Sequence, residues 1–285
     1  MATMREIKRR KESIQSTEQI TKAMKLVSTV KLQKSRAKAE NTKVYFETMY
    51  ATMASILARA HNINHPYLKA GSSPKKAVIV ITSNRGLAGG YNSNIVKLVT
   101  GMEASKENIV LYTIGRKGKD ALARKGYEVA EDYSDVINAP LYGDAIQIGD
   151  KVLEAFTNGE IGEIYLAYTS FKNTVVHNPK LLKLLPVEVD VSGVPKEDQV
   201  TPMNFEPDEE EALNAIVPKY FHSLIYGALL EAVASENGAR MQAMDSATSN
   251  ADEMIDKLSL SYNRARQASI TQELTEIIAG AEAIS

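Results

Sequence analysis

Apolar residues in the last eighty positions of the chain recur at alternating steps of three and four. This spacing is typical of a helix that presents one narrow stripe to a partner helix in a coiled coil. From residue 270 onward the stripe resumes after a step of five residues, which rotates the apolar face by about 100°. The pattern predicts a coiled-coil helix over 207–285 whose last segment leaves its partner and faces something else. The first stripe comprises Met241, Met244, Thr248, Ala251, Ile255, Leu258, Tyr262 and Ala265, and the second comprises Ile270, Leu274, Ile277, Ala281 and Ile284.

The first sixty residues predict the partner of that helix. Residues 4–60 contain no glycine or proline and are rich in helix-forming residues. Their apolar stripe is narrow but adequate for pairing with one other helix. We expect a helix over 1–60 that pairs antiparallel with the C-terminal helix, with Met24 near Leu258. The stripe comprises Ile7, Ile14, Ile20, Met24, Val27, Val30, Met49, Met53, Ile56 and Leu57.

The middle of the chain alternates short β-branched runs with helical patterns. A wholly apolar run at 77–81 is typical of a strand buried on both faces of a parallel sheet. Alternating strands and helices imply right-handed crossovers in a layered domain. The sequence therefore predicts an α/β protein, with a long antiparallel coiled coil of N- and C-terminal helices plus a central Rossmann-like α/β domain over 75–195. Further strands are expected at 109–114 and 163–168, helices at 91–102, 117–125 and 144–156, and a proline-bearing edge strand within 175–191.

A glycine-rich turn follows the first expected strand, where such turns can bind phosphate at a helix start. A phosphate loop needs GxxxxGK followed by Ser or Thr, and a dinucleotide fold needs GxGxxG. Gly86, Gly89 and Gly90 satisfy neither pattern. A structural turn is favoured over a cofactor site, and an enzyme of this fold would also need a convergent polar site that the sequence does not offer.

The net charge of −1 conceals an asymmetry between the two ends. Residues 1–43 hold twelve Lys or Arg against four acids, and residues 206–285 hold five against fourteen. The ends should attract each other, although two separate solvated faces would have the same composition. The basic segment could also bind nucleic acid. We do not expect this, because no aromatic residue precedes Tyr45 and the acidic helix is a ready partner.

Other chemistries have little support in the composition. The chain has no cysteine, and its four histidines show no HExxH spacing, so neither a thiolate nucleophile nor a metal site is expected. No window approaches eighteen consecutive apolar residues, and the N-terminus lacks the apolar stretch of a signal peptide. We expect no direct membrane insertion and a location on the cytoplasmic side.

Several separated segments resemble the gamma subunit of the bacterial rotary ATP synthase. They are residues 7–10, 17–28, 82–92, 240–244, 262–268 and, most clearly, 270–283, which read ITQELTEIIAGAEA. The chain departs from the family pattern at Asn84, where Asp is usual, and at Ala88, where Cys is common. The cysteine insertion of the chloroplast form is absent, so thiol control is not expected.

The resemblance implies a central rotor shaft in the proton-translocating F-type ATP synthase. Such a shaft couples rotation of the membrane c ring to ATP synthesis or hydrolysis at the catalytic hexamer of alpha and beta subunits, and it regulates ATPase activity and proton flow. The implied partners are the alpha and beta subunits, the epsilon subunit and the c ring. The implied location is peripheral on the cell membrane, and neither bond chemistry nor a cofactor is implied.

The resemblance also implies roles for particular residues. Coupling contacts with the alpha and beta subunits fall to Met24, Arg240, Arg266, Gln267, Thr271 and Glu273, and contacts with epsilon and the c ring fall to Phe205, Glu206, Asp208 and Glu209. A free coiled-coil scaffold or a nucleic-acid arm would account for the helices but would leave the central domain unexplained.

Overall fold

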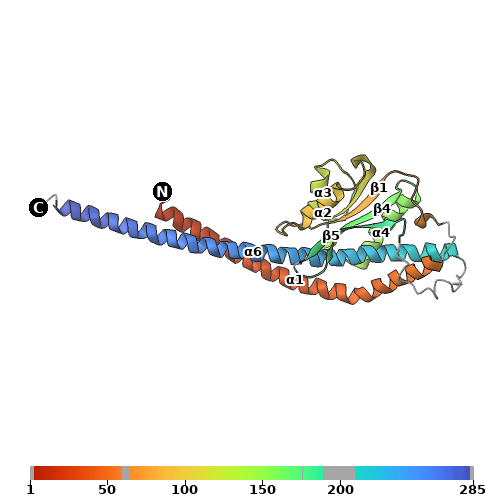
Figure 1. Cartoon of the computed structure of the whole chain (residues 1–285), viewed down its shortest axis with the longest axis horizontal. Coiled ribbons are helices and arrows are strands. Elements are labelled where there is room, and N and C mark those ends of the chain that lie inside the picture. Colours follow the sequence, from red (N-terminus) through yellow and green to blue (C-terminus); the bar gives the residue numbers. More distant parts are fainter. Residues whose placement is uncertain (1–2, 60–64, 175, 189–208, 283–285) are drawn as a thin grey trace. The chain divides into compact units, whose positions relative to one another are not determined.

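The computed structural model describes residues 3–59, 65–174, 176–188 and 209–282. The chain divides into two compact units, one formed by residues 1–28 with 241–285 and the other by residues 29–240. Two long helices, α1 (Met4–Arg59) and α6 (Glu209–Glu282), contribute to both units (Figure 1). The boundaries 1–60, 75–195 and 207–285 follow secondary structure, whereas these units follow packing, so the domain boundaries stay a prediction.

The larger unit, residues 29–240, is built around a five-stranded sheet in the order β3-β2-β1-β4-β5. The first four strands run parallel, and β5 is antiparallel to β4 at one edge. The strands are β1 (Lys76–Ile81), β2 (Ile109–Ile114), β3 (Glu128–Asp132), β4 (Glu163–Phe171) and β5 (His177–Leu185). The helices between them are α2 (Tyr91–Thr100), α3 (Arg116–Ala123) and α4 (Tyr142–Thr157), with short 3₁₀ turns at Pro66–Leu68, Lys106–Asn108 and Val136–Asn138.

The predicted strands and helices of the central region are confirmed, with one omission. The pattern of residues offers no reason to expect β3, because three of its five residues are acidic. An edge position explains how such a strand is tolerated, since charged side chains there remain in water and discourage pairing with other chains. The proline-bearing edge strand is also confirmed, and Pro179 lies within β5 opposite Thr169.

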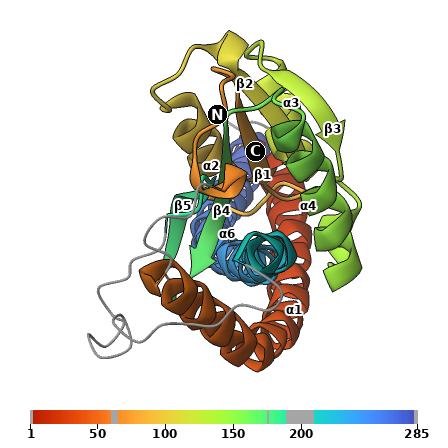
Figure 2. The ribbon, with the colours of Figure 1, turned by 90° about the vertical axis from the view of Figure 1, so that its right-hand side faces the viewer.

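Both faces of the sheet are covered, which explains the wholly apolar first strand. Val78 and Val80 face the layer formed by α2 and α3, while Ile79 and Ile81 face α4 and the long helices. Alternate side chains of a strand point to opposite faces, so a strand between two layers must be apolar throughout. Figure 2 shows the part of α6 in this unit lying between the sheet and α1.

A close contact between α4 and α6 depends on a glycine. The ring of His222 on α6 lies against Gly149 on α4, and its Nε2 is 2.9 Å from Oδ1 of Asp150. Burial lowers the pKa of His222, against the opposing effect of the Asp150 carboxylate. A Cβ at position 149 would lie 2.3 Å from Cδ2 of the ring, closer than side-chain packing permits.

In the smaller unit, α1 and α6 pair antiparallel, as predicted. The hydroxyl oxygens of Thr21 and Thr248 lie 2.8 Å apart, and Nζ of Lys25 on α1 lies 2.5 Å from Oδ1 of Asp245 on α6. As residue numbers rise along α1, the facing residue numbers on α6 fall, so the two helices run in opposite directions. This register places Met24 opposite 245–246, so its expected pairing near Leu258 is wrong.

The first predicted stripe on α6, from Met241 to Ala265, is confirmed. Every member is buried or half-buried, while most of the residues between them are exposed. The predicted stripe on α1 is only partly confirmed. Ile20 and Val27 are each 57% exposed, whereas Thr21 and Ser28 are buried in the seam. Their hydroxyls donate to the carbonyls of Glu18 and Met24 in the preceding turn, so they enter the seam without an unsatisfied donor.

Replacing Gly149 by Ala should lower the stability of the folded chain by about 2 kcal/mol, because the new methyl group must displace the His222 ring. The matched control is Gly143→Ala in the same helix, where a Cβ would meet nothing within 4 Å. That change should be neutral or stabilise by roughly 0.5–1 kcal/mol through helix propensity. Urea unfolding followed by circular dichroism measures both, and equal midpoints for the two variants would contradict the contact.

Cysteines at positions 21 and 248 should form a disulfide on oxidation, because the two hydroxyls that they replace already touch. The chain has no cysteine of its own, so the product is unambiguous. A pair at 24 and 258 is the control, since the register separates these positions by about twelve residues, roughly 18 Å along the helix. Non-reducing electrophoresis distinguishes them, and cross-linking of the control pair instead would mean that the register is wrong.

Candidate functional site

The C-terminal end of α6 is an exposed single helix. The register places the start of α1 near residue 265 of α6, which continues to Glu282, and Figure 1 shows this end extending beyond the N-terminal end of α1. All residues with described burial from 270 to 281 are exposed. Four of them are large and apolar, namely Ile270, Leu274, Ile277 and Ile278, at 49–68% exposure. Within the described residues, the predicted departure of this segment from its partner is confirmed.

The predicted coupling residues do not all lie in one place. Four are exposed on the end of α6, namely Arg266, Gln267, Thr271 and Glu273. Met24 is half-buried on α1, opposite a position on α6 that lies about twenty residues before Arg266, or roughly 30 Å along the helix. Arg240 belongs to the larger unit. The structure brings the first four together and places Met24 elsewhere in the same unit, and the contacts of all six with other subunits stay a prediction.

Met24 borders an exposed apolar surface that sequence reasoning missed. Ile20, Met24 and Val27 are spaced by four and three residues, so they share one face of α1. The apolar pattern assigns Ile20 and Val27 to the seam, yet both are exposed outside it. Four hydroxyl residues at intervals of seven carry the signal that could have located the seam correctly, and they leave the apolar face of α1 free for another contact. These residues are Thr21, Ser28, Ser35 and Thr42.

Arg240 is only 9% exposed and is engaged within the chain. Its Nη2 lies 2.7 Å from Oε1 of Glu236, one helical turn earlier. The same guanidinium donates, at 3.4 Å, to the backbone carbonyls of Arg85 and Gly86 in the glycine-rich turn. Burial raises the pKa of Glu236, while the positive charges of Arg240, Lys31 and Arg85 act to lower it. An acid four residues before an arginine was the sequence signal for this pair.

The glycine-rich turn, residues 83–90, is fastened by side chains of the same unit. Asn92 Oδ1 accepts from the backbone N–H of Ser83, at 2.9 Å. The amide of Asn84 donates to the carbonyl of Ser134 at 2.7 Å and accepts from the N–H of Arg116 at 3.0 Å. An aspartate at position 84, usual in the resembled family, could not donate to the carbonyl of Ser134, because an ionised carboxylate only accepts hydrogen bonds. The turn is therefore held in place with two of its carbonyls directed at α6.

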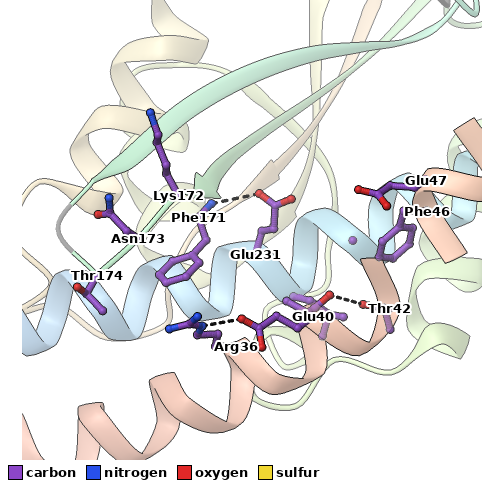
Figure 3. A pocket seen from close by; sticks show the side chains of 13 residues that line it. Arg36, Glu40, Thr42, Phe46, Glu47, Phe171, Lys172, Asn173, Thr174 and Glu231 are labelled. Atoms are coloured by element: carbon purple, nitrogen blue, oxygen red, sulfur yellow. Dashed lines mark hydrogen bonds and ion pairs between the residues drawn. The ribbon is translucent and has the colours of Figure 1, made fainter. Parts of the chain in front are cut away.

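A cavity of about 580 Å³ lies between α1, the β4–β5 hairpin and α6 (Figure 3). Charged side chains of both signs line it, including Arg36, Glu40 and Lys172. Arg36 pairs with Glu40 at 2.7 Å, and Glu231 accepts from the N–H of Phe171 at 3.1 Å. Arg36, Glu40 and Glu231 thus bond to neighbouring groups of the chain, and Figure 3 shows Lys172 pointing away from them, so the lining charges do not converge on one point.

Four predicted site residues fall at or beyond the limits of what the structure describes. Phe205, Glu206 and Asp208 lie in the undescribed stretch 189–208, and Glu209 is described only as the first residue of α6. Among the described residues, no group of three or more His, Cys, Asp or Glu side chains is arranged to hold a metal ion. No described helix is long and apolar enough to cross a membrane.

Comparison with known proteins covers the whole chain. A sequence model of the ATP synthase family matches residues 3–284. The ATP synthase gamma chain of Lachnoclostridium phytofermentans is 68% identical over 291 residues, covering 100% of both chains. The ATP synthase gamma chain, sodium ion specific, of Acetobacterium woodii is 42% identical over 298 residues, covering 99% of each chain.

Solved structures show the same fold. A chain of the Tetrahymena thermophila mitochondrial ATP synthase central stalk and c ring has a TM-score of 0.57 and 26% identity, covering 80% of this chain and 99% of that one. A chain of the Euglena gracilis mitochondrial ATP synthase has a TM-score of 0.70 and 21% identity, covering 99% and 94%. The family match and the full-length relatives together establish that the chain belongs to the family of ATP synthase gamma chains.

Proposed function

We propose that this chain is the central rotor shaft of an F-type ATP synthase. It couples rotation of a membrane c ring to ATP synthesis or hydrolysis at a hexamer of alpha and beta subunits. Family membership supports this role, and one observation carries it: an antiparallel coiled coil whose C-terminal helix continues alone with its apolar side chains uncovered. The chain is a non-catalytic subunit of that complex, and catalysis takes place on its partners.

The exposed end of α6 suits a bearing. Apolar contacts are non-directional, so their energy changes little as a shaft turns inside a sleeve. A shaft held by ion pairs would stop wherever those pairs formed, because each charge must be desolvated again at the next angle. Apolar side chains at the tip, Ile270, Leu274 and Ile277, therefore provide contact without a strongly preferred orientation. The polar residues Arg266, Gln267, Thr271 and Glu273 provide the angle-dependent contacts with the alpha and beta subunits.

The apolar face of α1 supplies a second contact with the hexamer. Ile20, Met24 and Val27 cover one side of the helix in the same unit as the exposed end of α6. Basic residues Lys22 and Lys25 lie beside them in the sequence. The half-buried Met24 at the edge of this surface fits a moving contact, because its flexible side chain adapts to changing neighbours.

The remaining contacts are those of the globular end with the epsilon subunit and the c ring. Phe205, Glu206, Asp208 and Glu209 provide them, with the aromatic ring as an apolar anchor and the acids as electrostatic partners. The chain then lies on the cytoplasmic side of the cell membrane as a peripheral subunit. The transported ion in this proposal is the proton. The Acetobacterium woodii relative is named sodium ion specific, and pumping in buffers with and without sodium distinguishes the two ions.

Met24→Lys should leave ATP hydrolysis by the reassembled complex in place and weaken ion pumping. The added cation must be desolvated against the hexamer at each step, which costs energy in every rotation. Two controls separate charge from shape: Met24→Leu keeps an apolar side chain, and Gln15→Lys adds the charge on another face of α1. Membrane potential generated per ATP hydrolysed is the measurement, and an unchanged ratio in Met24→Lys would remove this contact from the proposal.

Changing Glu206, Asp208 and Glu209 to Lys should loosen the chain from the c ring and epsilon, with a larger effect at low salt because electrostatic contacts are screened by ions. The control changes three acids elsewhere on the domain to Lys, and so alters the net charge equally; they are Glu103, Glu107 and Asp120. Recovery of the c ring and epsilon in a pull-down is compared at low and high salt. Equal recovery by both triple variants in every condition would place the interface elsewhere.

A further inference from the structure

The contact between α6 and the sheet is largely apolar over 213–229. Leu213, Val217, Phe221, Ile225 and Leu229 recur every four residues and are almost wholly buried. Such contacts oppose separation of the helix from the sheet. They also resist rolling of the helix about its own axis through the fit of packed side chains, as the His222 ring against Gly149 shows, but apolar attraction itself sets no rotation angle. Over 213–229, two polar contacts of α6 join Asn214 to His65 and His222 to Asp150 of α4.

Four further polar contacts gather at residues 231–240, where α6 meets β4, α2 and the glycine-rich turn. Glu231 accepts from the N–H of Phe171 at 3.1 Å, and the carbonyl of Ala232 accepts from the hydroxyl of Tyr91 at 3.1 Å. The hydroxyl of Ser235 donates to the carbonyl of Thr169, also at 3.1 Å. The last contact of the series is that of Arg240 with the glycine-rich turn. All four lie at or beyond the carboxyl ends of β1 and β4, within the larger unit.

The Arg240 contact differs from the other three because one side chain bonds to two backbone carbonyls of another segment. Its guanidinium lies at the end of a long side chain, so a force there opposes rotation of the helix with a lever. The planar group satisfies the Glu236 carboxylate and two carbonyls together, which a lysine ammonium could not match in geometry. Each carbonyl contact is long at 3.4 Å, and the short ion pair at 2.7 Å orients the guanidinium that makes them.

We propose that Glu236, Arg240 and the carbonyls of Arg85 and Gly86 form a torsional clamp, which prevents α6 from rolling on the α/β domain when torque passes along the helix. Arg240 and Glu236 are positioning residues in this role. The clamp deepens the proposed rotor function and rests on it. It also gives the glycine-rich turn a mechanical purpose, since the turn offers backbone carbonyls to α6 at the point where the larger unit ends.

The test uses the complete ATP synthase, reassembled in vesicles with this chain as its gamma subunit. Arg240→Lys keeps the charge and the helix, and Glu236→Gln keeps the size of the side chain. The matched control is Glu253→Gln, which breaks another ion pair of the same spacing on α6, between Glu253 and Lys257, that is exposed to solvent. A potential-sensitive dye reports pumping whichever ion is carried, and ATP hydrolysis is measured in the same vesicles.

Glu236→Gln should hydrolyse ATP at a rate within about two-fold of the wild-type and control rates when an uncoupler removes the load. Arg240→Lys is compared with it under load, because Arg240 is also a predicted coupling residue. Under load both clamp variants should slip, with uncoupled rotations rising roughly ten-fold because a charge-assisted contact is lost. A merely structural role would lower hydrolysis and pumping together and leave their ratio constant at every load. A constant ratio would therefore overturn the clamp while leaving the rotor function intact.

A covalent bridge provides the second measurement. Cysteines at positions 86 and 240, in a complex otherwise free of cysteine, can be joined by a short bis-maleimide. Position 86 has room for the new side chain, since a Cβ there meets only the end of Lys117 at 4.0 Å. The unbridged variant should slip, and bridging should restore the wild-type ratio of pumping to hydrolysis. A bridge that did not restore this ratio would contradict the clamp. If the wild-type chain supported no coupled pumping at all, the rotor function itself would be contradicted.

Discussion

The burial of α6 between the sheet and α1 is the interaction on which the larger unit depends. Its core combines side chains from the end of α1, from the sheet and α4, and from the start of α6. Phe46 of α1 packs on Gly227 of α6, where a Cβ would lie 3.1 Å from the ring, so even the backbone of α6 forms part of this core. Because these segments are far apart in sequence, the core closes only after the C-terminal helix has docked.

The same two helices serve different purposes along their lengths. From Tyr220 to Arg240 no residue of α6 is exposed, as expected of a helix enclosed by protein. Beyond Arg240 it keeps a narrow stripe for α1 alone, and beyond Ser269 it is exposed all round. On α1 the fully buried seam positions of the smaller unit are the hydroxyl residues Thr21 and Ser28, while Ile20 and Val27 are exposed. The exposed apolar pair lies about 100° around the helix from the seam, so pairing and an exposed contact surface occupy different faces of one helix.

The glycine-rich turn shows how a familiar layout can acquire another use. In open α/β sheets, ligands usually bind beyond the carboxyl ends of the strands, where the strand order reverses. Here β2 and β4 lie on the two sides of β1, so the reversal falls at the end of β1, where the turn begins. The chain's own helix lies against this position, and Arg240 takes up two carbonyls of the turn. The turn thus supports a helix by the same backbone groups that elsewhere surround a ligand.

Local pattern is enough to predict both long helices, four of the five strands and the α6 stripe, because each depends on the period of apolar residues along a single element. The register of the seam, by contrast, depends on which polar side chains can be satisfied, and Thr21 and Ser28 enter it only because the preceding turn accepts their hydrogen bonds. Apolarity alone therefore assigns Ile20 and Val27 to the wrong face. The pairing of Glu236 with Arg240 could be noticed from its spacing. Only the tertiary structure brings the glycine-rich turn to that pair, since a contact across 154 residues leaves no periodic signal in the sequence.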